Sequence, residues 1–217
     1  MGIKEQTNRN KVKHRKTKCA WLIICEGRNR TETNYLHHFS KRDGSVCLVI
    51  KPSENTDPKG MVLRAEKLAK DLDIGKNAGD RIICLIDLDI STEKAQTIDH
   101  LRRNHQKVEI IITNPCFEIW FLLHFTSHPD RESCSHNVKK QLARYIPNYT
   151  ENMDVMQKSK EVQSNYEIAI QNAEILRAEH IRKNLSILSP DANPYTEMDI
   201  LIKRLLSENG KPQIDNN

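Results

Sequence analysis

The chain has 217 residues, which is enough for one ordinary domain with appendages or for two small ones, at about 150 residues per domain. Hydrophobic residues make up 37% of it and charged residues 29%, with only 7 glycines and 8 prolines. This composition excludes collagen-like, low-complexity and mostly disordered chains, and it predicts a soluble globular protein. The formal net charge of +5 is unevenly distributed. Residues 1–18 hold seven basic side chains and one acid, a balance of +6, so the other 199 residues sum to −1.

The two ends of the chain are predicted to lie outside the folded part. Residues 1–18 are polar and basic and show no hydrophobic period, which predicts a flexible basic arm. Residues 208–217 are predicted to form a disordered tail. No apolar stretch is long enough for a signal-peptide core or a membrane span, so we expect a cytoplasmic protein with no membrane partner.

Apolar runs alternate with helical patterns between residues 19 and 126. Four of these runs, at 19–25, 46–50, 81–87 and 108–113, are typical of strands covered on both faces. Helix starts are predicted at Thr31, at Asp57 before Pro58, and at Ser91 or Thr92. The connections are too long for hairpins. The pattern therefore predicts an α/β, Rossmann-like core with a mostly parallel four-stranded sheet flanked by helices.

The pattern changes after residue 126. No further strand is predicted there, and helices are expected near residues 136–145, 165–183 and 196–206. Residues 127–207 are therefore predicted to form an all-helical C-terminal extension that packs on the core.

Carboxylates follow the predicted strands. Glu26 comes directly after the first strand, Asp87 and Asp89 end the third, and Glu118 lies one turn into the helix after the fourth. Ligands of open α/β sheets bind beyond the carboxyl ends of the strands, so these side chains are expected to converge if the first and third strands are neighbours. Clustered carboxylates raise one another's pKa unless a cation is present. The arrangement therefore predicts Mg²⁺ or Mn²⁺ held by Asp87, Asp89 and Glu118, with positions left open for phosphate oxygens.

Each of these features also has a purely structural explanation. An Asp at the end of a strand often caps the next helix, Glu-Gly is a common turn, and Glu118 is a favourable acid in a first helical turn. Gly27, Glu32 and Asn114 are predicted to support the site, Gly27 in the turn, Glu32 in the first helical turn and Asn114 by capping the helix that follows it.

An anionic ligand at this acidic edge needs cations nearby. Arg28 and Arg30, directly beside Glu26, are the best local candidates. The sequence contains no GxxxxGK[ST] or GxGxxG motif and no serine nucleophile elbow, so a glycine loop that cradles phosphates is excluded.

Four motifs occur in order between about Cys19 and Leu206: CEGRNRTETNYLHHF, the Asp87-x-Asp89 pair, NPCFEIWFLLHF and NPYTEMDILIKRLL. Together they resemble the RloB-like proteins, which are assigned to the Toprim-like group of metal-dependent folds. The resemblance implies a Toprim-like core over residues 19–126, with Glu26 as general acid or base and with Mg²⁺ on Asp87 and Asp89. Arg-Asn-Arg-Thr at residues 28–31 departs from the lysine expected there, and Arg28 and Arg30 are candidates to supply the missing charge.

The resemblance further implies a Mg²⁺-dependent nuclease that cleaves phosphodiester bonds in RNA, tRNA or DNA. Arg28 and Arg30 are then the best local candidates for nucleic-acid binding, because cations are needed to hold the backbone of the substrate. The resemblance also implies a prokaryotic anti-phage or abortive-infection defence system controlled by an ABC-type or AAA-type ATPase partner, and it allows a homo-oligomer. Two alternatives stay open. The chain could be a non-catalytic or ligand-sensing partner of a defence ATPase, or a general nucleic-acid-binding protein whose basic arm does the binding.

Overall fold

The computed structural model describes residues 18–27, 30–132 and 134–212. The predicted basic arm lies outside the described residues except for Lys18. Residues 213–217, which make up half of the predicted tail, also lie outside them. No helix in the described part of the chain is long and apolar enough to cross a membrane.

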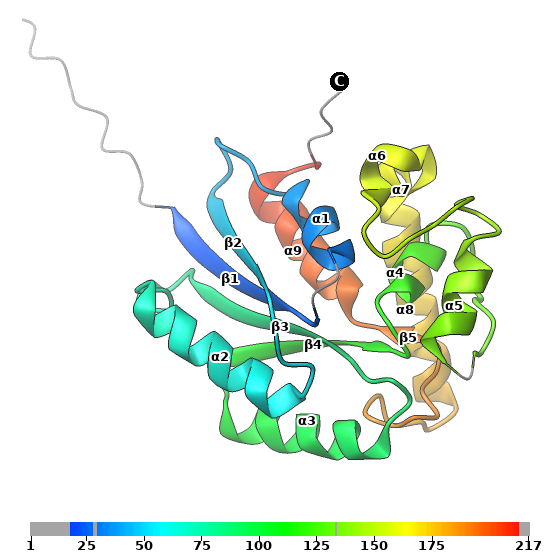
Figure 1. Ribbon diagram of the computed structural model, residues 1–217, viewed down its shortest axis with the longest axis horizontal. Helices are drawn as coiled ribbons and strands as arrows, with labels where there is room; N and C mark the ends of the chain where they lie inside the picture. Colours follow the sequence, from blue (N-terminus) through cyan, green and yellow to red (C-terminus); the bar gives the residue numbers. More distant parts are fainter. Residues whose placement is uncertain (1–17, 28–29, 133, 213–217) are drawn as a thin grey trace, which may run out of the picture.

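A five-stranded sheet forms the centre of the fold, in the order β2-β1-β3-β4-β5 (Figure 1). Its strands are β1 (Cys19–Cys25), β2 (Val46–Pro52), β3 (Arg81–Asp87), β4 (Val108–Asn114) and β5 (Tyr195–Thr196). The first four are parallel, as the long connections predicted, and β1 lies between β2 and β3. The fifth strand corrects the predicted four-stranded sheet. It has only two residues, which is too short to give a strand pattern in the sequence, and it pairs antiparallel to β4.

Helices cover both faces of the sheet (Figure 1). One face carries α2 (Pro58–Asp71) and α3 (Thr92–Asn104), which begin after the predicted caps Asp57 and Ser91. The other face carries α1 (Thr31–His37), α4 (Glu118–Leu122) and α9 (Met198–Asn209). Side chains of β1 alternate between the two faces, so Leu22 packs in one hydrophobic cluster and Ile23 in the other. Burial on both faces explains why β1 is apolar at nearly every position.

The remaining helices pack beside the sheet. They are α5 (Ser135–Leu142), α6 (Val155–Lys158), α7 (Lys160–Ser164) and α8 (Tyr166–Arg182). The predicted helices near 136–145 and 165–183 correspond to α5 and α8, whereas α6 and α7 were not predicted because one helical turn carries no periodic signal. The extension is helical apart from β5. Val138 and Ala169 share one buried cluster with Ile23 of the sheet, so these helices complete the core on that face.

The C-terminal boundary differs from the prediction. Helix α9 continues to Asn209, two residues into the predicted tail, because the Asn209 side chain is buried and fully used. Its Oδ1 accepts from Val46 N at 3.0 Å, and its Nδ2 donates to Phe39 O and Val46 O at 3.1 Å each. Asn209 thus fastens the end of the chain to the start of β2.

Replacing Asn209 with alanine is expected to lower the free energy of unfolding by about 2 to 3 kcal/mol, because three buried backbone groups lose their partner. Urea unfolding measures the loss. The exposed neighbour Ser207 is the matched control, and Ser207→Ala is expected to change stability by less than about 0.5 kcal/mol. Equal losses in the two variants would contradict the anchoring role of Asn209.

Candidate functional site

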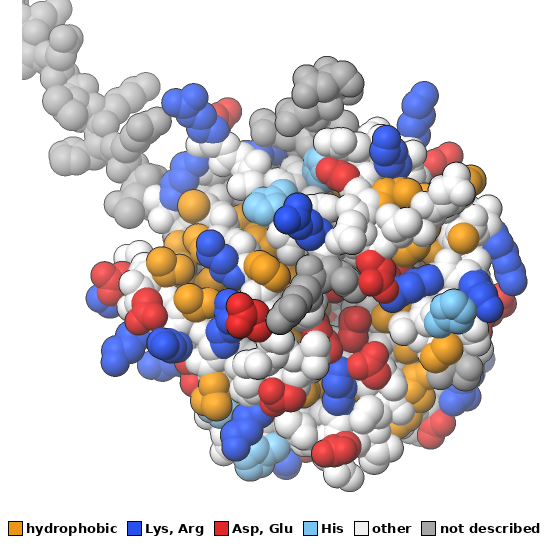
Figure 2. Space-filling view, in the orientation of Figure 1, with side chains coloured by type: hydrophobic (Ala, Val, Ile, Leu, Met, Phe, Trp, Pro, Cys, Tyr) orange, Lys and Arg blue, Asp and Glu red, His pale blue; other side chains and the backbone are white. Residues whose placement is uncertain are grey.

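The carboxyl ends of the strands surround an acidic pocket. Because β1 pairs directly with β3, the residues that follow these two strands are brought together, as the sequence predicted. The pocket has a volume of about 170 Å³. Figure 2 shows acidic side chains gathered in a hollow near the middle of this face of the molecule. Five carboxylates line it: Glu26, Glu32, Asp87, Asp89 and Glu118.

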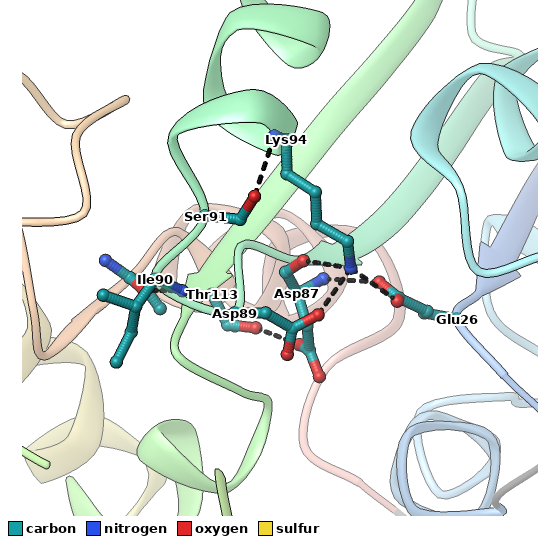
Figure 3. A network of polar contacts seen from close by, with 8 residues as sticks. Glu26, Asp87, Asp89, Ile90, Ser91, Lys94 and Thr113 are labelled. Atoms are coloured by element: carbon teal, nitrogen blue, oxygen red, sulfur yellow. Dashed lines mark hydrogen bonds and ion pairs between the residues drawn. The ribbon is translucent and has the colours of Figure 1, made fainter. Parts of the chain in front are cut away.

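Lys94 bridges the outer carboxylates of the pocket (Figure 3). Its Nζ donates to Glu26 Oε1 at 2.9 Å, to Asp89 Oδ2 at 2.6 Å and to the backbone oxygen of Asp87 at 3.0 Å. Glu26 is fixed a second time, because its Oε2 accepts from Asp87 N at 2.8 Å. Lys94 lies in the first turn of α3, where Ser91 Oγ accepts from its backbone N. Side chains on a helix lean toward its N-terminus, so this position delivers the ammonium group to the strand ends.

The turn after β3 has a strained backbone. Asp89 and Ile90 both adopt positive φ, +52° and +57°, which L-residues and β-branched ones in particular rarely do. Asp89 N donates to Pro115 O at 3.0 Å, and Ile90 N donates to Asn114 Oδ1 at 3.2 Å. The predicted capping role of Asn114 is therefore wrong. Its amide donates to Ala192 O at 2.7 Å, and its side chain supports the site by holding the Asp89 turn.

The inner carboxylates have different partners. Thr113 Oγ1 donates to Asp87 Oδ1, and Tyr149 donates its hydroxyl to Glu118 Oε1 at 2.8 Å. Glu32 is buried on α1, and its Oε2 has no hydrogen-bond partner among the described residues. Buried polar atoms are nearly always satisfied, so this carboxylate oxygen beside four other acids calls for a bound proton or a bound cation.

Burial and mutual repulsion raise the pKa values of these acids. Burial first, then the charges of Glu32 and Glu26, raise the pKa of Asp87 well above its usual range. Burial, with the charges of Glu118 and Glu26, raises the pKa of Glu32 to about 8. Burial also raises the pKa of Glu26, although Lys94 opposes the shift. At neutral pH the cluster therefore retains protons that a bound cation would displace.

The donor chemistry of the pocket suits a hard divalent cation. Asp87, Glu32 and Glu118 offer carboxylate oxygens, the ligands that Mg²⁺ and Mn²⁺ prefer, and the unpartnered Oε2 of Glu32 lies among them. Within residues 18–27, 30–132 and 134–212, no three His, Cys, Asp or Glu side chains form a ready-made ligand set. The sequence predicted Asp87 and Asp89 as a pair of metal ligands, but the two side chains have different partners. Asp87 accepts from Thr113, whereas Asp89 pairs with Lys94.

The two predicted basic residues, Arg28 and Arg30, do not line the acidic pocket as the structure describes it. Arg28 lies outside the described residues. Arg30 is exposed and lines a neighbouring pocket. Gly27 does line the acidic pocket, in the predicted turn, with φ of +74°. Thr31 is not the N-cap of α1, because Arg30 holds that position and Thr31 Oγ1 donates to Glu151 O.

Three side chains at the site were not predicted. Lys94 has a signal in the sequence, since it stands three residues after the Ser91 cap, on the turn of α3 nearest the strand ends. Tyr149 and Lys139 have none. Tyr149 lies in a loop, 31 residues from the Glu118 that it binds. Lys139 pairs with Glu151, and its Nζ lies 3.9 Å from Glu118 Oε1.

Comparison with known proteins identifies the family. The model of the RloB-like proteins matches residues 21–205, which is most of the chain. The chain belongs to the RloB-like family. Searches of curated proteins and of solved structures found no match. In this RloB-like protein the family match includes residues of every strand of the sheet, all of β1 but its first two residues, and all five carboxylates of the acidic pocket.

Proposed function

We propose that this RloB-like protein is a divalent-metal-dependent nuclease that cleaves phosphodiester bonds. The observation that carries the proposal is the acidic pocket, where five carboxylates meet at the strand ends and Glu32 Oε2 is left without a partner. Asp87, Glu32 and Glu118 would hold Mg²⁺ or Mn²⁺. When bound, the ion would polarise the phosphodiester and neutralise charge on its oxygens.

Glu26 is the candidate for proton transfer. A general acid or base works best when its pKa lies near the working pH, and burial moves the pKa of Glu26 upward in that direction. Two contacts fix its carboxylate, one to Lys94 Nζ and one to Asp87 N, which keeps it beside the other acids. Both the general acid and the general base role agree with this geometry.

Lys94 supplies positive charge at a pocket that would otherwise repel an anionic substrate. Burial alone would lower the pKa of Lys94, but the hydrogen bond to Asp89 and the charge of Glu26 outweigh it and raise the pKa. Lys94 is therefore a cation at neutral pH. It holds Glu26 and Asp89 in place and offsets part of the negative charge at the edge of the acidic pocket.

The wider assignment rests on the family resemblance. A role in prokaryotic anti-phage defence and control by an ABC-type or AAA-type ATPase partner belong to the same proposal. RNA, tRNA and DNA all remain candidate substrates, since the pocket chemistry addresses the phosphodiester that they share.

The test is cleavage by the purified full chain. End-labelled RNA, tRNA and DNA are incubated with the protein in Mg²⁺, in Mn²⁺ and in EDTA, with and without a candidate ATPase partner. We expect product only with Mg²⁺ or Mn²⁺. Equal cleavage in EDTA would contradict the metal-dependent proposal. Absence of product from all three substrates, with the ATPase present, would favour the ligand-sensing alternative.

A further inference from the structure

A second pocket lies next to the acidic one, and it is basic. Its volume is about 620 Å³, and it runs beside the edge strand β2 between α1 and α2. Arg30 comes from the start of α1, Lys51 from β2 and Arg64 from α2, whereas Glu54 is the one carboxylate among the residues that line it. In Figure 2, basic and histidine side chains lie over α1 and β2, above and to the left of the acidic hollow.

In the described ranges, the three cations of this basic pocket, Arg30, Lys51 and Arg64, form no ion pair, whereas Lys94 and Lys139 at the acidic pocket do. Arg64 is half-buried, and its Nε is shielded from solvent without a hydrogen bond. Leaving a shielded guanidinium N–H unsatisfied costs free energy, and an anionic ligand that paired with Arg64 would offset that cost.

The basic and acidic pockets share two walls. At the start of α1, Arg30 faces the basic pocket and the adjacent Thr31 faces the acidic one. In the loop after β2, Glu54 lines the basic pocket and Thr56 the acidic one. Pro52 at the end of β2 is paired with Cys25 at the end of β1, so the two pockets lie at the ends of adjacent strands. The backbones of such strands are about 5 Å apart.

This adjacency favours an extended polyanion over a free phosphate. A lone phosphodiester is repelled by the five carboxylates of the acidic pocket. A strand with several phosphates overcomes that repulsion if the cations next door hold one phosphate while its neighbour enters the acidic pocket. We infer that the basic pocket of Arg30, Lys51 and Arg64 binds the backbone phosphates of the nucleic-acid strand that is cleaved at the acidic pocket.

The inference rests on the proposed nuclease function and adds which part of the substrate the protein binds. Among the described residues that line the basic pocket there is no Phe, Tyr or Trp, so the large rings on which bases usually stack are missing there. Burial and the charge of His38 lower the pKa of His37, the histidine in its wall, so the charge comes from the arginines and the lysine. Contacts to phosphate position a strand and carry no sequence information. Binding at this pocket is therefore insensitive to base sequence.

The test measures binding in EDTA, where cleavage does not interfere. Fluorescent single-stranded RNA and DNA oligonucleotides are titrated with the full chain at several salt concentrations. For the variant Arg30→Gln/Lys51→Gln/Arg64→Gln we expect affinity to fall at least about 10-fold near 0.1 M salt. The slope of log affinity against log salt should be shallower by about 2, since each phosphate contact contributes about 0.7.

A matched variant separates local contacts from net charge. Lys67→Gln/Lys70→Gln/Lys107→Gln removes the same charge from exposed positions that line neither pocket, and it should leave affinity and slope within about 2-fold of wild type. Arg64 is half-buried, so the exposed pair Arg30→Glu/Lys51→Glu is measured as well, with thermal melts to verify folding.

Three outcomes would overturn the inference. In the first, the pocket variant and the control variant bind equally. In the second, inorganic phosphate or ATP displaces the oligonucleotide at equal concentration, which would make the pocket a mononucleotide site. In the third, affinity depends strongly on base sequence. Cleavage of the same oligonucleotides by the wild type in Mg²⁺ is measured separately. If the wild type bound the oligonucleotides through the basic pocket but did not cleave them, the proposed nuclease function would be contradicted, whereas the inferred phosphate contacts would not.

Discussion

Replacing Asp87 with asparagine is expected to lower metal-dependent cleavage by at least about 10²-fold, because it removes the carboxylate at the centre of the acidic pocket. The substitution preserves shape. Asparagine retains an oxygen that can accept from Thr113 Oγ1, so the contact to β4 survives. Since burial and the charges of neighbouring acids raise the pKa of Asp87, removing its charge should leave the melting temperature equal to or above that of wild type. Cleavage rates and thermal melts of the same preparations measure both effects.

Asp99→Asn provides the matched control. Asp99 is exposed on α3 and pairs with Arg103, away from the pocket, and surface ion pairs of this kind contribute little to stability. Its cleavage rate should equal that of wild type. If Asp87→Asn kept activity within about 3-fold of this control, Asp87 would have no part in catalysis.

The alternation of strands and helices could be predicted from local patterns. Runs such as RIICLID are apolar on both faces because each residue packs in one of two layers, and Asp57 and Ser91 cap helices through side chains fixed by sequence neighbours. The remainder depends on contacts far apart in the chain. Strand β5 has two residues and pairs only because α9 returns to the sheet, and Asn209 continues α9 because Val46 lies beside it.

In the candidate site, too, some features could be predicted from local sequence patterns and others depend on contacts between distant residues. The rule that strand ends converge placed Glu26 and Asp87 together, and the contact from Asp87 N to Glu26 Oε2 agrees with it. Burial decided the rest. The sequence predicts Glu32 only as a supporting acid in the first helical turn, but α1 packs it into the acidic pocket. Asp89 turns to Lys94, a partner fixed by the strained turn that Asn114 holds.

Replacing Glu32 with glutamine is expected to stabilise the protein when no divalent cation is present. Burial and the neighbouring acids raise the pKa of Glu32 to about 8 from a usual value near 4.5. Between these two values the folded state binds a proton that the unfolded state has lost, so the wild-type side chain costs stability as pH rises. Glutamine does not titrate. The variant should therefore gain about 1 to 3 kcal/mol at pH 8 and only a small part of that at pH 5.

Urea unfolding at pH 5, 6.5 and 8 measures this gain in EDTA. The exposed Glu167 in the first turn of α8 is the control, and Glu167→Gln should give the same small difference at each pH. A gain for Glu32→Gln that was independent of pH would mean that packing, and not charge, sets its effect. A loss of stability at pH 8 would contradict the raised pKa.

Divalent cations should reverse the stability difference between Glu32→Gln and wild type. If Glu32 Oε2 is an open ligand position, Mg²⁺ or Mn²⁺ displaces its proton and stabilises the wild type, more at pH 8 than at pH 6. Glu32→Gln loses a charged ligand and should gain less from the ion at every pH. If Glu32 were a purely structural acid, Glu32→Gln would be more stable than wild type in EDTA but would gain as much stability from the ion as wild type does. Glu32→Gln is therefore expected to be more stable than wild type in EDTA and less stable than wild type in Mn²⁺ only if Glu32 Oε2 binds the metal.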